Sequence, residues 1–217
     1  MPTVLITGLN TAFDRKLAAI FVREGYQVFA IAGRGVKGLR LLPTDLAQAA
    51  HIVEDAAGKL DLYVDVSDFR HAADDFTIQD GLDEAVIRSV YEENVLRPMA
   101  CLEAFLPLLD KGEKKRLCFL TSERASINET REKTGYAYNM SKAAIHNFFQ
   151  MIANKLSPTG YSLRVYDPMP GKLTTTQSAE AALHYFVRRR GTEREDPLRD
   201  DETRLVFRDA FGREHSW

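Results

Sequence analysis

The stretch TVLITGLNTAFDRKLAAIFVREGYQVFAI, residues 3–31, decides the fold. Residues 3–6 form a short apolar run that predicts a buried strand. Apolar residues then recur at helical spacing over residues 13–24, and Gly25 ends this helix. Residues 26–31 predict a second strand. The chain therefore opens as a β-α-β unit, which implies parallel strands and a right-handed crossover.

The same alternation continues along the chain. Helical patterns cover residues 46–59, 82–109 and 138–156, and strand patterns cover residues 60–66, 115–120 and 161–166. The crossover helix expected after the second strand is missing, because a short glycine-rich segment, residues 33–38, stands in its place. No repeat or low-complexity linker interrupts the pattern. We predict an α/β fold: a Rossmann-type, doubly wound parallel sheet in three α/β/α layers, with residues 1–217 forming a single domain.

Composition favours a small-molecule partner. The chain of 217 residues has a formal net charge of −2, which gives no field that would attract nucleic acid or an anionic membrane. No apolar run approaches the roughly 20 residues that span a bilayer, and the N-terminus lacks the layout of a signal peptide. Cys101 and Cys118 fit two reduced, buried thiols, and the histidines show no metal-ligand spacing. We expect a cytoplasmic protein without a metal.

Residues 188–204 form a dense run of mixed charge, RRRGTEREDPLRDDETR. Interleaved opposite charges create little net field, so the run predicts a solvated loop. The alternative is that Arg188–Arg190 grip an anion.

Tyr138 and Lys142 carry the strongest chemical signal. They lie four residues apart at the start of a predicted helix, so their side chains share one face. A phenol titrates near ~10, and a nearby ammonium favours the phenolate, so Lys142 is expected to lower the pKa of Tyr138 and tune it as a general acid or base. Ser122 follows a predicted strand, at the edge where such sheets bind ligands. Taken alone, the Tyr-Lys spacing also arises by chance, and Asn94 also fits an exposed helix residue.

In combination, these residues resemble the short-chain dehydrogenase/reductase family over nearly the whole chain. The resemblance rests on the order of its motifs: the Thr7-Gly8 turn, Asn94, Ser122, Tyr138-x-x-x-Lys142 and Pro170-Gly171. It implies that Tyr138 is the catalytic acid/base, and that Lys142 lowers its pKa and binds the nicotinamide ribose. It also implies that Ser122 hydrogen-bonds the substrate oxygen and that Asn94 supports a proton-relay water. Residues 205–217 look like the family's terminal strand and tail.

The resemblance further implies a nicotinamide dinucleotide. The matching cofactor positions are Gly8, Asn10, Thr11, Ala12, Phe13, Arg34, Asp45, Leu46, Val66, Ser67, Tyr138, Lys142, Pro170, Gly171 and Leu173. Among them, Asp45 would meet the adenine amino group and Leu46 would flank the ring. Arg34, helped by Lys37, stands where an acidic residue would select NAD, so we predict a preference for NADP through its extra phosphate. If Arg34 is a plain surface arginine, NAD remains the alternative.

Four departures from the family pattern concern this cofactor. Ala12 and Asp14 replace two glycines of the turn, and Asp14 either repels the phosphates or favours the positive end of the helix. Residues 65–68 read Asp-Val-Ser-Asp in place of Asn-Asn-Ala-Gly. The missing crossover helix leaves the adenosine side more open. The gap between Ser122 and Tyr138 is longer than usual, so residues 129–134 are expected to bulge around the site.

These observations predict an NAD(P)-dependent oxidoreductase that interconverts a carbonyl and a secondary alcohol. One alternative is a family-like protein that binds a nucleotide, or none, and acts through protein contacts. Another is a non-redox member that catalyses epimerisation or elimination. The segment over residues 172–180 would line the substrate pocket and is short, which suggests an open cleft. The helices over 82–109 and 138–156 are apolar on more faces than one sheet covers, so we predict a homodimer or homotetramer.

Overall fold

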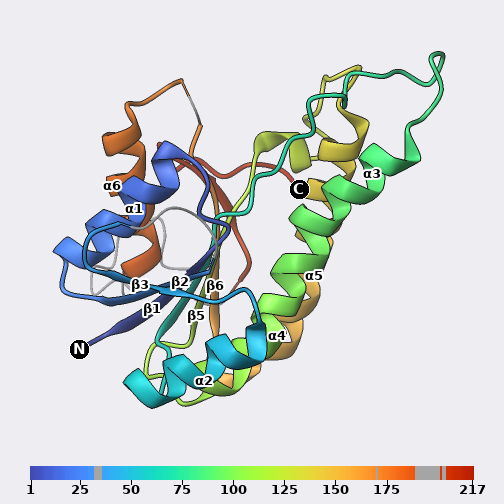
Figure 1. The fold of residues 1–217 in the computed structure, drawn as a ribbon. Coiled ribbons are helices and arrows are strands. Elements are labelled where there is room, and N and C mark those ends of the chain that lie inside the picture. The colour runs from blue at the N-terminus through green and yellow to red at the C-terminus, as the bar shows by residue number, and fades with distance from the viewer. Residues whose placement is uncertain (32–35, 170, 189–200, 202–203) are drawn as a thin grey trace.

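Seven parallel strands form one sheet in the order β3-β2-β1-β4-β5-β6-β7 (Figure 1). The computed structural model describes residues 1–31, 36–169, 171–188, 201 and 204–217. The strands are β1 (Thr3–Thr7), β2 (Gln27–Ile31), β3 (Leu39–Leu42), β4 (Leu62–Asp65), β5 (Arg116–Leu120), β6 (Ser162–Asp167) and β7 (Phe207–Asp209). The order runs outward in both directions from β1 and β4, which confirms the doubly wound Rossmann-type sheet.

Helices cover both faces of this sheet. On one face lie α1 (Ala12–Arg23) and α6 (Thr175–Val187), which pack on each other; on the other lie α2 (Leu46–Ala57), α4 (Arg97–Asp110) and α5 (Tyr136–Leu156). The helix α3 (Glu84–Tyr91) continues the direction of α4 beyond the sheet and packs on α5 (Figure 1). The three predicted layers are confirmed. Of these helices, α6 has no counterpart among the helical patterns identified in the sequence.

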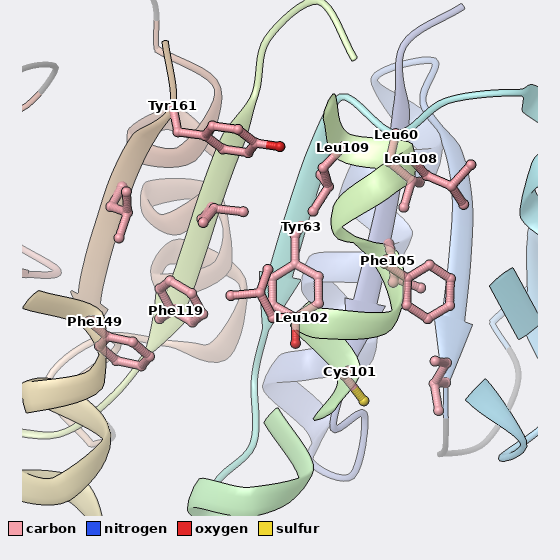
Figure 2. Packing of buried hydrophobic residues seen from close by; sticks show 14 of the residues in the cluster. Leu60, Tyr63, Cys101, Leu102, Phe105, Leu108, Leu109, Phe119, Phe149 and Tyr161 are labelled. Carbon is pink, nitrogen blue, oxygen red and sulfur yellow. The ribbon is translucent and has the colours of Figure 1, made fainter. Parts of the chain in front are cut away.

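The core divides into two clusters because successive strand residues point to opposite faces of the sheet. Cys118 belongs to the cluster under α1 and α6, whereas its neighbour Phe119 belongs to the cluster under α2, α4 and α5. Figure 2 shows the second cluster, in which the ring of Phe119 stacks on that of Phe149 with centroids 4.0 Å apart. Tyr63 lies between Phe119 and the residues of α4 (Figure 2). This packing fixes β5 and α5 relative to each other.

The connection between β2 and β3 is short. The two strands pair in parallel, and β3 begins at Leu39, so residues 32–38 alone join them. A parallel crossover ordinarily takes about a dozen residues or more. Within the described part of this connection, Val36–Gly38, there is no helix, in agreement with the predicted loss of the crossover helix.

The helix predicted over residues 82–109 is divided into three parts. A π-helical segment, η1 (Glu92–Leu96), joins α3 to α4 without a break in the helical direction. Pro98 lies in the first turn of α4 and has no N–H to donate to the carbonyl of Asn94, so regular α-helical bonding fails here. Isolated π-turns of this kind often lie at functional sites, and this one carries Asn94.

Three further features concern the cysteines, metal ligands and the lengths of the helices. Cys101 and Cys118 are both buried, and neither lies in a disulfide. Among the described residues there is no group of side chains arranged to hold a metal ion. A search of the same residues finds no helix with the length and apolarity that crossing a membrane requires.

Candidate functional site

The turn after β1 packs closely against the chain after β4. Gly8 has a φ of +82°, and a Cβ at this position would lie 2.7 Å from the backbone nitrogen of Ser67, so only glycine fits. Thr11 caps α1. Asp14 turns back onto its own turn, where one carboxylate oxygen accepts the N–H groups of Asn10 at 2.9 Å and Thr11 at 2.6 Å. Burial raises the pKa of Asp14, while these hydrogen bonds act in the opposite direction. Of its two predicted roles, Asp14 takes the helix-capping one.

Asp65 replaces the first asparagine of the family turn and braces the sheet. Its carboxylate accepts the Thr7 hydroxyl at 2.7 Å and the Ser67 N–H at 3.1 Å. Thr7 and Asp65 are direct neighbours across β1 and β4. Burial raises the pKa of Asp65, and the hydrogen bonds from Thr7 and Ser67 counteract that rise. A carboxylate thus ties the two central strands together at the carboxyl edge.

The start of α5 is fixed by a residue from a distant loop. The N-cap position of α5 is Gly135, which has no side chain to accept the first N–H groups of the helix. Asp74 supplies the missing acceptor, since its two oxygens accept the N–H groups of Ala137 at 3.0 Å and Tyr138 at 2.8 Å. An anion at a helix N-terminus is stabilising. Asp74 therefore positions the backbone of Tyr138.

Tyr138 lies among charged side chains. Its hydroxyl donates to Asp68 Oδ1 at 2.5 Å and accepts from Arg70 Nη2 at 3.1 Å. The guanidinium of Arg70 also lies 4.1 Å from the centre of the phenol ring. Lys142 Nζ is 3.2 Å from the same Asp68 oxygen and donates to the Ser67 carbonyl at 2.7 Å. One carboxylate oxygen thus contacts both members of the Tyr-Lys pair.

This environment changes the predicted electrostatics. Burial raises the pKa of Tyr138, and the Asp68 carboxylate raises it further, whereas Arg70 and the Ser122 hydroxyl oppose the rise. The pKa of Tyr138 is therefore raised overall and not lowered, and the Lys142 ammonium that was expected to lower it is paired with Asp68. Burial would raise the pKa of Asp68 too, but Lys142 and the Tyr138 hydroxyl outweigh it and hold that pKa below its usual value. The phenol stays protonated and the carboxylate stays ionised.

Asn94 is buried and anchors the loop that carries Asp68. Its amide nitrogen donates to the Phe69 carbonyl at 2.9 Å and to Ser141 Oγ at 3.0 Å, and its oxygen accepts the Phe69 N–H at 2.8 Å. The alternative of an exposed helix residue is therefore wrong. Both amide groups of Asn94 thus hold the backbone of this loop.

Two cavities open along the carboxyl edge of the sheet. The smaller, about 280 Å³, is lined by six predicted cofactor residues: Thr11, Ala12, Phe13, Val66, Gly171 and Leu173. The larger, about 550 Å³, is lined by four others: Gly8, Asn10, Leu46 and Ser67. Asp68 lines both cavities, whereas neither described lining includes Ser122, Tyr138 or Lys142. Asp68 therefore lies between the two cavities and the Tyr-Lys pair.

The remaining predicted residues lie elsewhere. Asp45 caps α2 by accepting the Gln48 N–H at 2.9 Å and lines neither cavity. Lys37 is exposed. Arg34, Pro170 and most of the charged run, residues 189–200 and 202–203, lie outside the described residues.

Two loops that the sequence predicts to border the site lie within the described residues. Residues 129–134 pack against Arg124, which pairs with Glu132 at 3.0 Å, and Glu129 accepts the Ser216 N–H at 3.2 Å. The predicted substrate segment, residues 172–180, runs into α6 and contributes Leu173 to the smaller cavity.

The donors in these cavities allow a test of the fit to a dinucleotide. Asp14 uses the N–H groups of Asn10 and Thr11, but those of Ala12 and Phe13, in the first turn of α1, have no partner within the helix and remain available for a phosphate. The smaller cavity has a mainly apolar lining, which suits a flat ring. At the smaller cavity and the start of α1, the residues present therefore fit the group, with one exception: Lys142, the residue matched to the ribose, is already paired with Asp68.

His146 lies one helical turn after Lys142 and faces the core. Its Nε2 is 2.6 Å from the Thr121 hydroxyl, and the rings of Phe207 and Trp217 lie against it, each with its centroid 5.0 Å from that of the imidazole. Its Nδ1 is buried without a hydrogen-bond partner in the described structure. Burial, assisted by the charge of Lys142, lowers the pKa of His146 to about 3. The folded protein therefore holds a neutral imidazole.

This burial predicts a loss of stability in mild acid. Below pH ~6.5 the unfolded chain protonates His146 and the folded chain does not, so the free energy of unfolding falls as the pH falls toward the folded pKa. Relative to His146→Gln, we expect wild type to lose about 1.4 kcal/mol per pH unit between roughly pH 6 and 4. Urea titrations followed by Trp217 fluorescence measure this difference. Parallel pH profiles for the two proteins would show that His146 already protonates in the folded state.

Sequence reasoning missed three residues of the site: Asp68, Arg70 and Asp74. Asp68 was visible as a departure from the family turn, and its place in the turn that follows a central strand is a signal that it faces the ligand edge. Arg70 and Asp74 lie in a loop without periodicity, so no local pattern points to them.

Comparison with known protein families matches residues 2–184 to the short chain dehydrogenase family. An uncharacterized oxidoreductase of Schizosaccharomyces pombe is 32% identical over 134 residues, which cover 62% of this chain and 51% of the relative. The chain spans about half the length of the curated relatives it matches.

Solved structures share the fold. The carbonyl reductase Sniffer of D. melanogaster superposes with a TM-score of 0.80 at 16% identity, over 100% of both chains. A carbonyl reductase from Pseudomonas aeruginosa PAO1, solved in complex with NADP, gives 0.74 at 21% identity, again over 100% of both chains.

Proposed function

Because this chain belongs to the short-chain dehydrogenase/reductase family, we propose that it is an NADP-preferring oxidoreductase that interconverts a small-molecule carbonyl and a secondary alcohol. One observation carries the proposal. Tyr138, Lys142 and the loop anchored by Asn94 meet at the carboxyl edge, beside the N-terminus of α1 and two cavities. An arrangement built only for stability has no need to collect these polar groups at a ligand edge.

The side chains divide the chemistry among them. When bound, the nicotinamide would supply or accept the hydride. Tyr138 donates its proton to the carbonyl oxygen. Ser122, whose hydroxyl interacts with the phenol and opposes the rise of its pKa, donates a second hydrogen bond to the same oxygen. Lys142 would hold the ribose of the bound cofactor, and Asn94 keeps the backbone of the neighbouring loop in place.

The protonation state of the phenol fits the role of a general acid. Burial and Asp68 raise the pKa of Tyr138, so the hydroxyl is protonated throughout the neutral range. A protonated phenol is the acid that carbonyl reduction needs, whereas alcohol oxidation needs a base. In the free protein the phenol is therefore in the proton-donating form that carbonyl reduction uses.

Titration with NADPH and NADH, followed by nicotinamide fluorescence, tests this proposal. We expect both to bind, NADPH about tenfold more tightly, which corresponds to ~1.4 kcal/mol from a charge-assisted contact with its extra phosphate. Arg34→Gln is the matched variant, since it should abolish the difference and leave NADH binding unchanged. The oxidoreductase proposal fails if wild type binds neither dinucleotide at millimolar concentration.

A second candidate is a family protein without redox activity. The larger cavity favours it, because its lining carries four carboxylates, on Asp65, Asp68, Glu92 and Glu93, against one guanidinium. That guanidinium, on Arg97, is itself paired with Glu93 at 2.9 Å. Such a lining disfavours an anionic ligand. Binding of NADPH without any turnover of a carbonyl panel would support this candidate, and product analysis would reveal an epimerase or lyase.

The homodimer or homotetramer predicted from the sequence remains a proposal. Exposed apolar side chains on η1 and α5, namely Leu96, Met140 and Met151, support it.

A further inference from the structure

Asp68 contacts both members of the proposed catalytic pair. Its Oδ1 accepts the Tyr138 hydroxyl at 2.5 Å and lies 3.2 Å from Lys142 Nζ. Its Oδ2 lies 3.9 Å from Arg70 Nε. A single carboxylate thus occupies the polar groups of both residues, including the lysine that the proposed function assigns to the cofactor.

The backbone around Asp68 is fixed, but its side chain is not enclosed. Lys142 holds the Ser67 carbonyl, and Asn94 holds both backbone groups of Phe69. Between these anchors, the Asp68 side chain is 38% exposed, whereas that of Lys142 is 2% exposed. Rotation of the Asp68 side chain toward solvent would therefore uncover Lys142 and Tyr138 without moving the loop.

Because Asp68 lies beside the cavities, rotation of its side chain would affect ligand binding. Asp68 lines both cavities and separates them from Tyr138 and Lys142. A ligand in these cavities meets the carboxylate before it meets either catalytic side chain. A dinucleotide also brings phosphate charge to the same edge, which adds repulsion to the competition.

We propose that Asp68 is an internal competitor of the dinucleotide: it pairs with Tyr138 and Lys142 in the free protein, and the cofactor binds only when the carboxylate is displaced. This inference rests on the proposed function. When a fraction of the protein is in the competent state, the apparent Kd is the intrinsic Kd divided by that fraction. Removing the carboxylate should therefore tighten binding.

Three variants test the competition. Asp68→Asn keeps the size and removes the charge, and Asp68→Gly restores the residue of the family turn. Asp75→Asn is the matched control, because Asp75 is an exposed carboxylate of the same loop and changes the net charge equally. We expect both Asp68 variants to lower the Kd for NADPH at least tenfold and the control to change it less than twofold. Thermal melting of each variant checks that it folds.

A second measurement reports the contact without any cofactor. In the free protein, Asp68→Asn should lower the pKa of the Tyr138 phenol. Ultraviolet difference titration measures this pKa, with Tyr138→Phe as the reference that lacks the phenol. Unchanged Kd values in both Asp68 variants would overturn the competition and leave the proposed function standing. Absence of NADPH binding in all four proteins would instead overturn the proposed function, and the competition with it, while the phenol titration still shows whether Asp68 holds Tyr138.

Discussion

Tyr138→Phe is expected to lower kcat for NADPH-dependent carbonyl reduction by about 10²- to 10⁴-fold, the usual contribution of a positioned general acid. The change removes one oxygen and leaves the ring under the Arg70 guanidinium, 4.1 Å from its centre. The fold around α5 should survive, because Asp74 holds the backbone N–H of residue 138 and not its side chain. The loss should therefore appear in the chemical step.

Tyr136→Phe is the matched control for this experiment. It makes the same chemical change two residues earlier, where the hydroxyl accepts the Ile78 N–H at 3.4 Å and the ring lies edge-on to Phe76. We expect its kcat to stay within twofold of wild type. Steady-state kinetics on a carbonyl panel, with the Kd for NADPH measured in parallel, separate chemistry from binding. Equal rates for wild type and Tyr138→Phe would remove the phenol from the mechanism.

The sheet was predictable because its strands are apolar on both faces and its first three elements form a β-α-β unit. Strand order and register, such as the alignment of Thr7 with Asp65, were not predicted, because parallel pairing alone leaves both open. The π-turn at Asn94 was not predicted, because apolar periodicity runs through it unchanged and only Pro98 marks the irregularity. The helix α6 was missed for another reason: its small and polar residues give a weak apolar pattern.

The candidate site was predictable only where a residue follows a strand or repeats along a helix. Tyr138, Lys142 and Ser122 meet these conditions, and the structure brings them to one edge of the sheet. Their electrostatics could not be predicted, because the carboxylate of Asp68 arrives from a loop whose path depends on tertiary contacts with Asn94. The spacing of Tyr138 and Lys142 in the sequence suggests a lowered phenol pKa, whereas in the fold the pKa of Tyr138 is raised.

The largest expected loss of stability comes from Phe119→Ala. Phe119 is 1% exposed, stacks on Phe149 with an interplanar angle of 20°, and lies 6.0 Å from the ring centre of Tyr63. Truncating a buried phenylalanine removes its transfer free energy and leaves a cavity, at a cost of about 3–5 kcal/mol. For a chain of this size that lowers Tm by about 10 °C. Since a domain is stabilised by only ~5–15 kcal/mol, the variant stands close to unfolding.

Phe211→Ala is the control, because it makes the same truncation at a side chain that is 54% exposed, and we expect a loss below about 1 kcal/mol. Urea titration of the three proteins measures both values. Phe119 joins β5, which ends before Ser122, to α5, which carries Tyr138, so the same cavity should loosen the distance between the two proposed proton donors. We therefore expect Phe119→Ala to lose activity below its Tm as well. If Phe119→Ala changed the free energy of unfolding only slightly, the stacking of Phe119 on Phe149 would not be what stabilises the packing of β5 on α5.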